Sequence, residues 1–271
     1  MSTGSASRAD APPSTAEIMA VFLARDLRDG EQLQVGIGLP VPEAAVRLAH
    51  LLHGPNMELI FLGARMNVAH LERIPLPAFG WDNRIVRWAE SFSDRGHRFD
   101  RTGDWKRRVF FIGGIQVDPY GNTNLIGVGS DYRKLDFRGP GSVGTPPLTS
   151  HVGRYHIVLN SHTARTFVPR CDFISTVGWG QGGADARTKL ALPGGGPQYC
   201  VTPRAVMDFT PKEKRLRLRH VHPGHSVEEV RAHTGFELVV PDVVPETPLP
   251  DARELAVLRE RVDPEGVLRR L

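Results

Sequence analysis

The chain has 271 residues, of which 40% are hydrophobic and 24% charged, so global disorder and a fibrous repeat are excluded. The chain has 34 lysines and arginines against 30 aspartates and glutamates, which is a small excess of positive charge. In the densest basic stretch, residues 212–219, basic residues alternate with leucine, as they do in a strand with one solvated face. We therefore expect no nucleic-acid partner. Two cysteines are too few for a disulfide framework, and neither a signal-peptide pattern nor a long apolar segment is found, so we expect a cytoplasmic protein that contacts no membrane.

The first expected element is a helix that follows a short tail. Residues 1–13 are rich in Ser, Ala and Pro and are expected to be disordered. Ser14 and Glu17 form a capping-box pattern, in which the serine hydroxyl accepts from a helical amide and the glutamate binds back to the cap. Apolar residues at helical spacing follow, and Gly30 is expected to end the helix.

A strand–turn–helix–strand order comes next and predicts a βαβ unit. The strands are expected at residues 32–37 and 57–63, with a helix between them. Gly36 and Gly38 stand in the first turn, where a ligand could reach the amides of a helix N-terminus. Val41 occupies the place of the third glycine of a dinucleotide fingerprint, which argues against a nicotinamide-dependent dehydrogenase.

The rest of the chain continues this alternation of strands and helices. Residues 80–106 show no clean periodicity and are expected to form helical or irregular cover, and the glycine clusters within residues 178–200 predict a mobile loop at an active site or interface. Further strands are expected at residues 109–114, 156–160, 172–177, 205–209 and 215–221, and further helices after the caps Ser226 and Asp251. These elements predict an α/β fold, with an open, mainly parallel sheet and helices on both faces, in a single domain over residues 14–271.

Two segments in the middle of the chain carry the clearest chemical pattern. Residues 116–124 turn through Asp-Pro-Tyr-Gly and carry the amide side chains of Gln116 and Asn124. Residues 139–144 form a glycine-rich loop whose bare backbone amides could stabilise an oxyanion. Arg133 precedes this loop and either binds a substrate carboxylate or phosphate or is a solvated loop charge. The candidate binding residues of the loop are Gly139, Gly141, Ser142 and Gly144.

Three histidines, His220, His222 and His225, also stand close together in the sequence. The first two would share one face of a strand, as metal ligands can. However, no carboxylate or cysteine stands at a matching short spacing. The pattern favours a turn in which the imidazoles bind the backbone, and we expect no metal.

The order and spacing of these segments resemble the B (β) subunit of the class I CoA-transferase superfamily, above all the glutaconate CoA-transferase type. Related branches are the steroid-ring-opening hydrolases and the methylglutaconyl-CoA decarboxylases. The resemblance covers roughly residues 15–271 and rests on the turn at 116–124, the loop at 139–144, His-Pro-Gly at 222–224, Thr-Gly-Phe at 234–236 and Val-Asp-Pro at 262–264.

The resemblance implies a heteromeric enzyme with the CoA-transferase-like fold. Its partner would be an α subunit, in a heterodimer or heterotetramer. An acyl-CoA thioester would be the substrate, and no cofactor would be permanently bound. The glycine-rich loop would then contribute to an oxyanion hole for the thioester. The acyl group is not specified by the sequence.

The chain departs from the family at the nucleophile. In the transferases, a glutamate on the second strand of this subunit attacks the thioester, and residues 53–57 match the approach to that strand. The glutamate position then falls on Leu62, which cannot act as a nucleophile. Glu58 would share its strand face but lie about 13 Å away.

Relatives that lost this glutamate still act on CoA thioesters, as hydrolases or decarboxylases, and the hydrolase branch takes its essential carboxylate from the other subunit. Three functions therefore stay open for this chain. They are CoA transfer, C–C hydrolysis or decarboxylation with the catalytic residues on the α subunit, and a catalytically silent β chain.

Overall fold

The computed structural model describes residues 11–36, 38–61, 64–76, 87–92, 102–142 and 144–271. The chain divides into two units. Unit 1 consists of Met1–Glu31, Ile37–Phe92 and Pro248–Leu271, and unit 2 consists of Gln32–Gly36 and Ser93–Thr247. The single domain expected over residues 14–271 stays a prediction.

Unit 1 is built on helices from both ends of the chain. They are α1 (Thr15–Asp26), α2 (Pro40–Leu52), α7 (Ala252–Val257), the π-helical turn η3 (Leu258–Val262) and the 3₁₀ turns η1 (Val68–Arg73) and η4 (Leu268–Arg270). The predicted cap of α1 is confirmed, because the Glu17 amide donates to Ser14 Oγ at 3.2 Å and the Ser14 amide donates to the Glu17 carboxylate at 2.8 Å. Asp251 caps α7 in the same way. The buried Glu17 also accepts from Arg259 Nε at 2.9 Å, which ties α1 to η3.

The same Arg259 binds the end of the N-terminal tail. Its guanidinium donates to the carbonyl oxygens of Ala11 at 2.8 Å and Pro12 at 3.2 Å. Residues 1–10 of the expected tail lie outside the described residues.

The strands of unit 1 are antiparallel. They are β2 (Glu58–Phe61), β3 (Ala64–Asn67) and β4 (Ser91–Phe92), in that order. The predicted strand at residues 57–63 is present as β2, although Leu62 and Gly63 lie outside the described residues. Of the irregular span predicted at residues 80–106, the structure describes β4 and a 3₁₀ turn, η2 (Thr102–Arg107), which belongs to unit 2.

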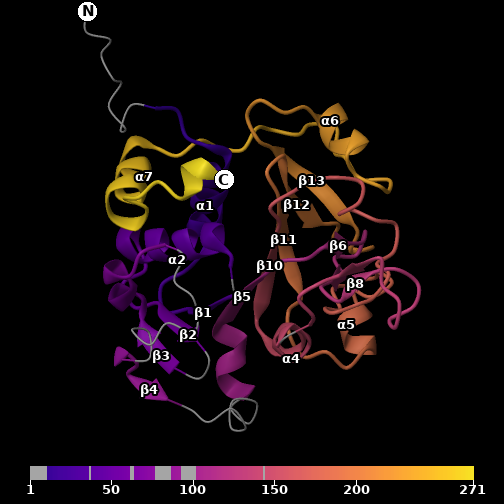
Figure 1. Ribbon diagram of the computed structural model, residues 1–271, viewed down its shortest axis with the longest axis horizontal. Helices are drawn as coiled ribbons and strands as arrows, with labels where there is room; N and C mark the ends of the chain where they lie inside the picture. Colours follow the sequence, from indigo (N-terminus) through magenta and orange to yellow (C-terminus); the bar gives the residue numbers. More distant parts are fainter. Residues whose placement is uncertain (1–10, 37, 62–63, 77–86, 93–101, 143) are drawn as a thin grey trace, which may run out of the picture. The chain divides into compact units, whose positions relative to one another are not determined.

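Unit 2 contains a six-stranded sheet in the order β13-β12-β11-β10-β5-β1, of which β10 to β13 lie side by side in Figure 1. The strands are β1 (Gln32–Val35), β5 (Arg108–Ile112), β10 (Arg154–Val158), β11 (Pro197–Val201), β12 (Ala205–Phe209) and β13 (Leu216–Val221). The pairings from β1 through β5 and β10 to β11 are parallel, and β12 and β13 add antiparallel strands. Strand β5, which lies between β1 and β10, is buried along its whole length, as a strand covered on both faces must be. The predicted α/β fold with a mainly parallel sheet is confirmed.

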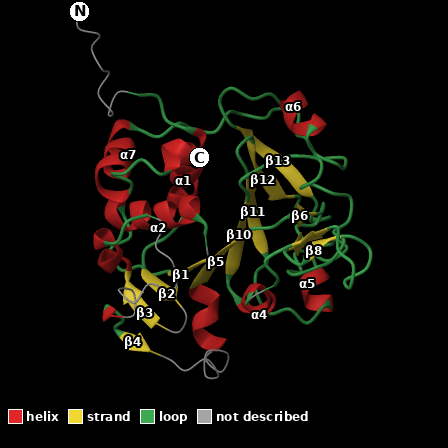
Figure 2. Ribbon diagram, viewed as in Figure 1, coloured by secondary structure: helices red, strands yellow, loops and turns green. Residues whose placement is uncertain are grey.

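Short elements and long loops surround this sheet, and loops dominate around β6 and β8 in Figure 2. Two hairpins lie there, β6 (Gln116–Val117) with β7 (Thr123–Asn124) and β8 (Gly127–Val128) with β9 (Phe137–Arg138). The helices of unit 2 are α4 (Thr145–His151), α5 (Ala186–Lys189) and α6 (Val227–Ala232). No helix in the described ranges is long and apolar enough to cross a membrane.

Two sequence expectations in unit 2 need correction. Residues 172–177 form no strand, because their pairing with β7 is a single bridge between Thr123 and Thr176, beside which the Ser175 amide donates to the Thr123 carbonyl at 2.8 Å. The glycine-rich span at residues 178–200 is not one loop, since it contains α5 and β11. Short elements between glycine clusters leave too few residues for a recognisable period.

Candidate functional site

The site begins at the sheet edge where parallel strands end. The Gly36 amide donates to the Phe111 carbonyl at 3.1 Å, in continuation of the parallel pairing of β1 with β5. Because the two strands run in the same direction, the turns after Gly36 and after Gly113 leave the sheet at the same edge. Ligands of open α/β sheets bind at this carboxyl edge. Gly38 has a φ of 71°, which glycine adopts without strain, and the residue between Gly36 and Gly38 lies outside the described residues.

Gln116 and Asn124 are cross-strand partners in the β6–β7 hairpin. Asn124 is fully buried, and its Nδ2 donates to Gln116 Oε1 and to the Gly127 carbonyl, both at 2.7 Å. Its Oδ1 accepts from the Ile126 amide at 2.8 Å. Both N–H groups and the carbonyl oxygen of the Asn124 side chain therefore bind groups of the chain itself. Both side chains are placed to fix the hairpin and the strand after it.

The tip of the same hairpin is held by Asp118. Its carboxylate accepts from the amides of Tyr120 at 3.0 Å and Asn122 at 3.1 Å, and from Asn122 Nδ2 at 2.7 Å. Burial raises the pKa of Asp118 above its usual range, although these hydrogen bonds oppose that shift. Asn122 Oδ1 in turn accepts from the Gly178 amide at 2.9 Å, which joins the tip to the segment before α5.

Gly121 allows the tip to approach the sheet. Its φ is 70°, and a Cβ there would lie 2.6 Å from Cζ of Phe209. A glycine is therefore required both by the backbone conformation and by the close contact.

The glycine-rich loop divides into bonded and open amides. The Gly139 and Gly141 amides donate to the carbonyls of Ile126 and Leu125, both at 2.8 Å, so these two predicted donors are already used by the backbone. Within the described ranges, the amides of Ser142 and Gly144 donate no hydrogen bond. Gly144 is also the N-cap of α4, whose first turn adds no open amide, because Pro146 and Pro147 have no N–H and the Thr145 amide donates to the Ser142 carbonyl at 3.0 Å.

The charged residues beside the loop are solvated. Arg133 is exposed, and its amide donates to Asp131 Oδ1 at 2.9 Å. Arg138 lies with its guanidinium carbon 5.1 Å from the ring centre of Tyr132. Both cations therefore stay accessible to an anionic group.

Sequence reasoning missed Asp172 and Ser175, which attach a distant segment to the site. The Asp172 amide donates to Gln116 Oε1 at 3.0 Å, and its carboxylate accepts from the Gly129 amide at 2.9 Å. Ser175 Oγ accepts from the Leu125 amide at 2.7 Å. A signal was available, since these polar residues interrupt the apolar pattern of the strand expected at residues 172–177.

The histidines bind the chain rather than one another. His222 is buried, and its Nε2 donates to the Thr202 carbonyl at 2.9 Å, which leaves Nδ1 to accept from the Thr247 hydroxyl at 2.8 Å. Burial lowers the pKa of His222 to about 4. His225 instead pairs with Glu229 at 3.0 Å. No group of three metal-ligating side chains occurs in the part of the chain that the structure describes.

The nucleophile position, Leu62, lies outside the described residues. Glu58, four residues earlier on β2, is mostly buried, and its carboxylate forms an ion pair with Arg65 of β3.

Known proteins match both the sequence and this architecture. The family model for coenzyme A transferase matches residues 104–233, which include the hairpin and the glycine-rich loop. The B chain of glutaconate CoA-transferase from Acidaminococcus fermentans is 32% identical, with 92% of each chain covered. The B chain of 3-oxoadipate CoA-transferase from Pseudomonas knackmussii is 36% identical, with 91% of this chain and 92% of the relative covered. The chain belongs to the coenzyme A transferase family.

Within this family, the chain is the β component of a heteromeric enzyme, as the resemblance implied. The crystal structure of the A. fermentans glutaconate CoA-transferase matches with a TM-score of 0.83 at 28% identity, covering 94% of this chain and 97% of that one. The cholesterol ring-cleaving hydrolase IpdB subunit of Mycobacterium tuberculosis is 30% identical, with 93% of this chain and 96% of the relative covered. The decarboxylase AibA/AibB shares the fold, with a TM-score of 0.78 at 23% identity, covering 95% of this chain and 98% of that one. Relatives of this fold therefore catalyse more than one reaction.

Proposed function

We propose that this β chain serves in a C–C hydrolase or decarboxylase of an acyl-CoA, and that no covalent glutamyl intermediate forms on this chain. The observation that carries the proposal is the leucine at position 62, where the family resemblance places the glutamate nucleophile. The essential carboxylate then comes from the α subunit, and this chain supplies pocket walls and oxyanion donors.

The carboxylates of Glu58, Asp118 and Asp172 support this division of labour, because all three are already engaged. Glu58 is paired with Arg65. Asp118 accepts three hydrogen bonds in its own turn, and Asp172 accepts from the Gly129 amide and from Gln116 Nε2. A carboxylate tied up in this way is a poor nucleophile and a poor general base.

The open amides of Ser142 and Gly144 are the proposed donors to the thioester oxygen. Hydrolysis and decarboxylation of an acyl-CoA both develop negative charge on this oxygen, and preorganised amides stabilise such charge. The stabilisation of this oxygen also depends on residues that fix the loop, namely Gln116, Asn124 and Gly141. The CoA thioester is thus a substrate, and the proposed site needs no permanently bound cofactor.

The substrate class we propose is the CoA thioester of a dicarboxylic or β-keto acid. Two relatives are named for glutaconate and 3-oxoadipate, both of which are dicarboxylates. The exposed cations Arg133 and Arg138 stand beside the loop and suit a free substrate carboxylate. The two buried free cysteines, Cys171 and Cys200, and a CoA substrate support a cytoplasmic location.

A trapping experiment tests the proposal. The complex of this chain with its α subunit is incubated with 3-oxoadipyl-CoA or glutaconyl-CoA, treated with borohydride or hydroxylamine, and analysed by peptide mass spectrometry. We expect no modified peptide around residue 62, and formation of a C–C cleavage product that keeps its CoA thioester, or release of CO₂, without any added carboxylate acceptor. A Leu62→Glu variant serves as the positive control, since it restores a candidate nucleophile.

The alternative reaction, CoA transfer, is favoured by the 32% and 36% identity to two transferase chains. A CoA-derived mass increment on the peptide containing Leu62 in the unmodified chain, with turnover that depends on a carboxylate acceptor, would establish transfer and refute the proposal. A catalytically silent β chain predicts instead that changes in the glycine-rich loop leave kcat unaffected.

A further inference from the structure

A hollow outside the proposed oxyanion site lies in unit 2, against strands β10 to β13. Its volume is about 370 Å³, within the size range of small-ligand sites. It is lined by residues of β10, β11, β12 and β13 and of the turn between the last two, and none of the proposed oxyanion donors takes part.

The charged side chains that line this hollow are predominantly cationic. Arg154, Lys214 and Arg219 line it, against a single carboxylate among its described lining residues, that of Asp208. Asp208 is already bound by Arg217, with two contacts of 2.8 Å, and by Arg219 at 3.3 Å. The hollow therefore keeps a net positive charge and favours an anionic ligand.

Aromatic rings accompany the cations. Lys214 Nζ lies 4.4 Å from the ring centre of Trp179, and the guanidinium carbon of Arg219 lies 5.6 Å from that of Tyr199. The indole Nε1 of Trp179 is buried and has no hydrogen-bond partner among the described residues.

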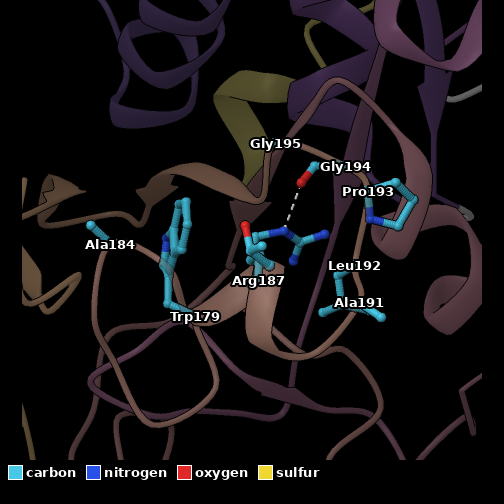
Figure 3. A pocket seen from close by; sticks show the side chains of 9 residues that line it. Trp179, Ala184, Arg187, Ala191, Leu192, Pro193, Gly194 and Gly195 are labelled. Atoms are coloured by element: carbon cyan, nitrogen blue, oxygen red, sulfur yellow. Dashed lines mark hydrogen bonds between the residues drawn. The ribbon is translucent and has the colours of Figure 1, made fainter.

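Trp179 and Gly195 are shared with a neighbouring hollow of about 550 Å³, shown in Figure 3. Its wall includes the apolar side chains of Ala184, Leu192 and Pro193. The cation there, Arg187, is not available to a ligand, because its guanidinium donates to backbone carbonyls, among them that of Gly194 at 2.8 Å. Cationic and apolar surfaces thus meet at Trp179.

We propose that this region binds a nucleotide phosphate, with the phosphate against Lys214 and Arg219 and the base against Trp179 or Tyr199. Cations that already contact aromatic rings suit a ligand that carries both an anion and a flat ring. This chemistry has two sources, a free nucleotide and the nucleotide end of CoA. Binding of the nucleotide end of CoA rests on the proposed acyl-CoA function, whereas binding of a free nucleotide does not.

Lys214 allows binding to be separated from folding. Its φ is 56°, a left-handed conformation that glycine adopts without strain. A Lys214→Gly change removes the cation and relieves this strain, so the melting temperature should stay the same or rise while the nucleotide affinity falls. Lys214→Arg keeps the charge, and Lys212→Ala removes an exposed cation of the same turn that does not line the hollow.

The measurement is calorimetric titration of the complex of this chain with its α subunit, using adenosine 3′,5′-bisphosphate, with adenosine and inorganic phosphate as partial probes. We expect saturable binding of the bisphosphate that weakens with added salt. The affinity should fall about 10- to 100-fold in Lys214→Gly. It should be largely kept in Lys214→Arg and unchanged in Lys212→Ala. Absence of binding at millimolar probe, or an equal loss in Lys212→Ala, would overturn the proposal.

Saturating CoA distinguishes the two sources. Competition with the bisphosphate identifies the nucleotide end of CoA as the ligand, and undiminished binding identifies a free nucleotide. Because the titration involves no turnover, it stands whichever reaction the enzyme catalyses.

Discussion

At the scale of single residues, the glycine-rich loop uses its amides in two ways. Gly139 and Gly141 donate to carbonyls of the segment after β7, which sets the path of the loop. Gly144 then stands at the start of α4 with a φ of −101°, where its amide has no partner within the described ranges. The conformation needs no glycine there, since a Cβ would meet only Leu148 Cδ1 at 3.6 Å.

This geometry gives a matched pair of variants. Gly144→Ala keeps the amide and should leave kcat nearly unchanged. Gly144→Pro removes the donor, and loss of one oxyanion donor typically lowers kcat by about 10²- to 10³-fold. Steady-state kinetics of the complex with the α subunit test whether the Gly144 amide is an oxyanion donor. Thermal melts confirm that both variants fold. Equal kcat values for the two folded variants would exclude this amide from the oxyanion site.

Two buried histidines couple the stability of unit 2 to pH. Burial lowers the pKa of His162 to about 3 and that of His222 to about 4, from an ordinary value of 6.5. The folded state therefore holds both rings neutral, whereas the unfolded chain protonates them below pH 6.5. Their contribution is fully present above pH 6.5 and is lost as the pH falls toward the folded-state pKa values.

We expect the free energy of unfolding to decrease between pH 6.5 and pH 4, by about 3 kcal/mol for each histidine at most. His222→Gln should reduce this slope, because an amide does not titrate. Denaturant unfolding of the chain at several pH values measures both effects. An unchanged slope in the variant would show that His222 is not held neutral in the folded state.

At the scale of elements, the short helix α5 is linked to neighbouring segments by one side chain, that of Arg187. Arg187 is buried and donates to the carbonyls of Val177 and Gly178 before the helix, Thr149 and Ser150 at the end of α4, and Gly194 after α5. No carboxylate is among these partners, and burial lowers the pKa of the guanidinium. One cation thus joins the end of α4, the segment before α5 and the segment after it.

Replacement of Arg187 by Met should therefore destabilise the chain by about 3 kcal/mol or more, since several buried carbonyls lose their donor. Lys189→Met on the same helix is the control, because Lys189 is exposed and pairs only with Asp185 on the surface. That variant should change stability by about 0.5 kcal/mol or less. Comparable losses in both variants would show that Arg187 does not link these segments.

At the scale of the whole molecule, apolar side chains beside the site remain exposed. Tyr132, Phe137 and Ile174 keep 50–55% of their surface accessible, close to the loop that carries the proposed donors. Trp179, in the glycine-rich span for which the sequence suggested an interface, instead packs against the core of unit 2. Exposed aromatics are frequent where a protein meets a partner.

We expect the chain expressed alone to self-associate, and co-expression with its α subunit to give a defined heteromer. Size-exclusion chromatography with light scattering measures both states. A monodisperse monomer that turns over an acyl-CoA without the α subunit would contradict the division of labour proposed above.

The sequence by itself determined the local features whose cause is local. The capping box at Ser14, the cap at Asp251, strand β12 and the Asp-Pro-Tyr-Gly turn depend on side chains within a few residues, and each is found where it was expected. The order of the two central segments also sufficed to indicate the family.

Only the tertiary structure decided how the site is assembled. The Gly141 amide is bonded because the Leu125 carbonyl lies beside it, and the fixation of Gln116 depends on Asp172, which is 56 residues away. Residues 172–177 read as a strand because their own composition favours one. They are not a strand because their backbone hydrogen bonds to Thr123 of the hairpin form a single bridge rather than a ladder. Such bonds join distant segments, so no local pattern encodes them.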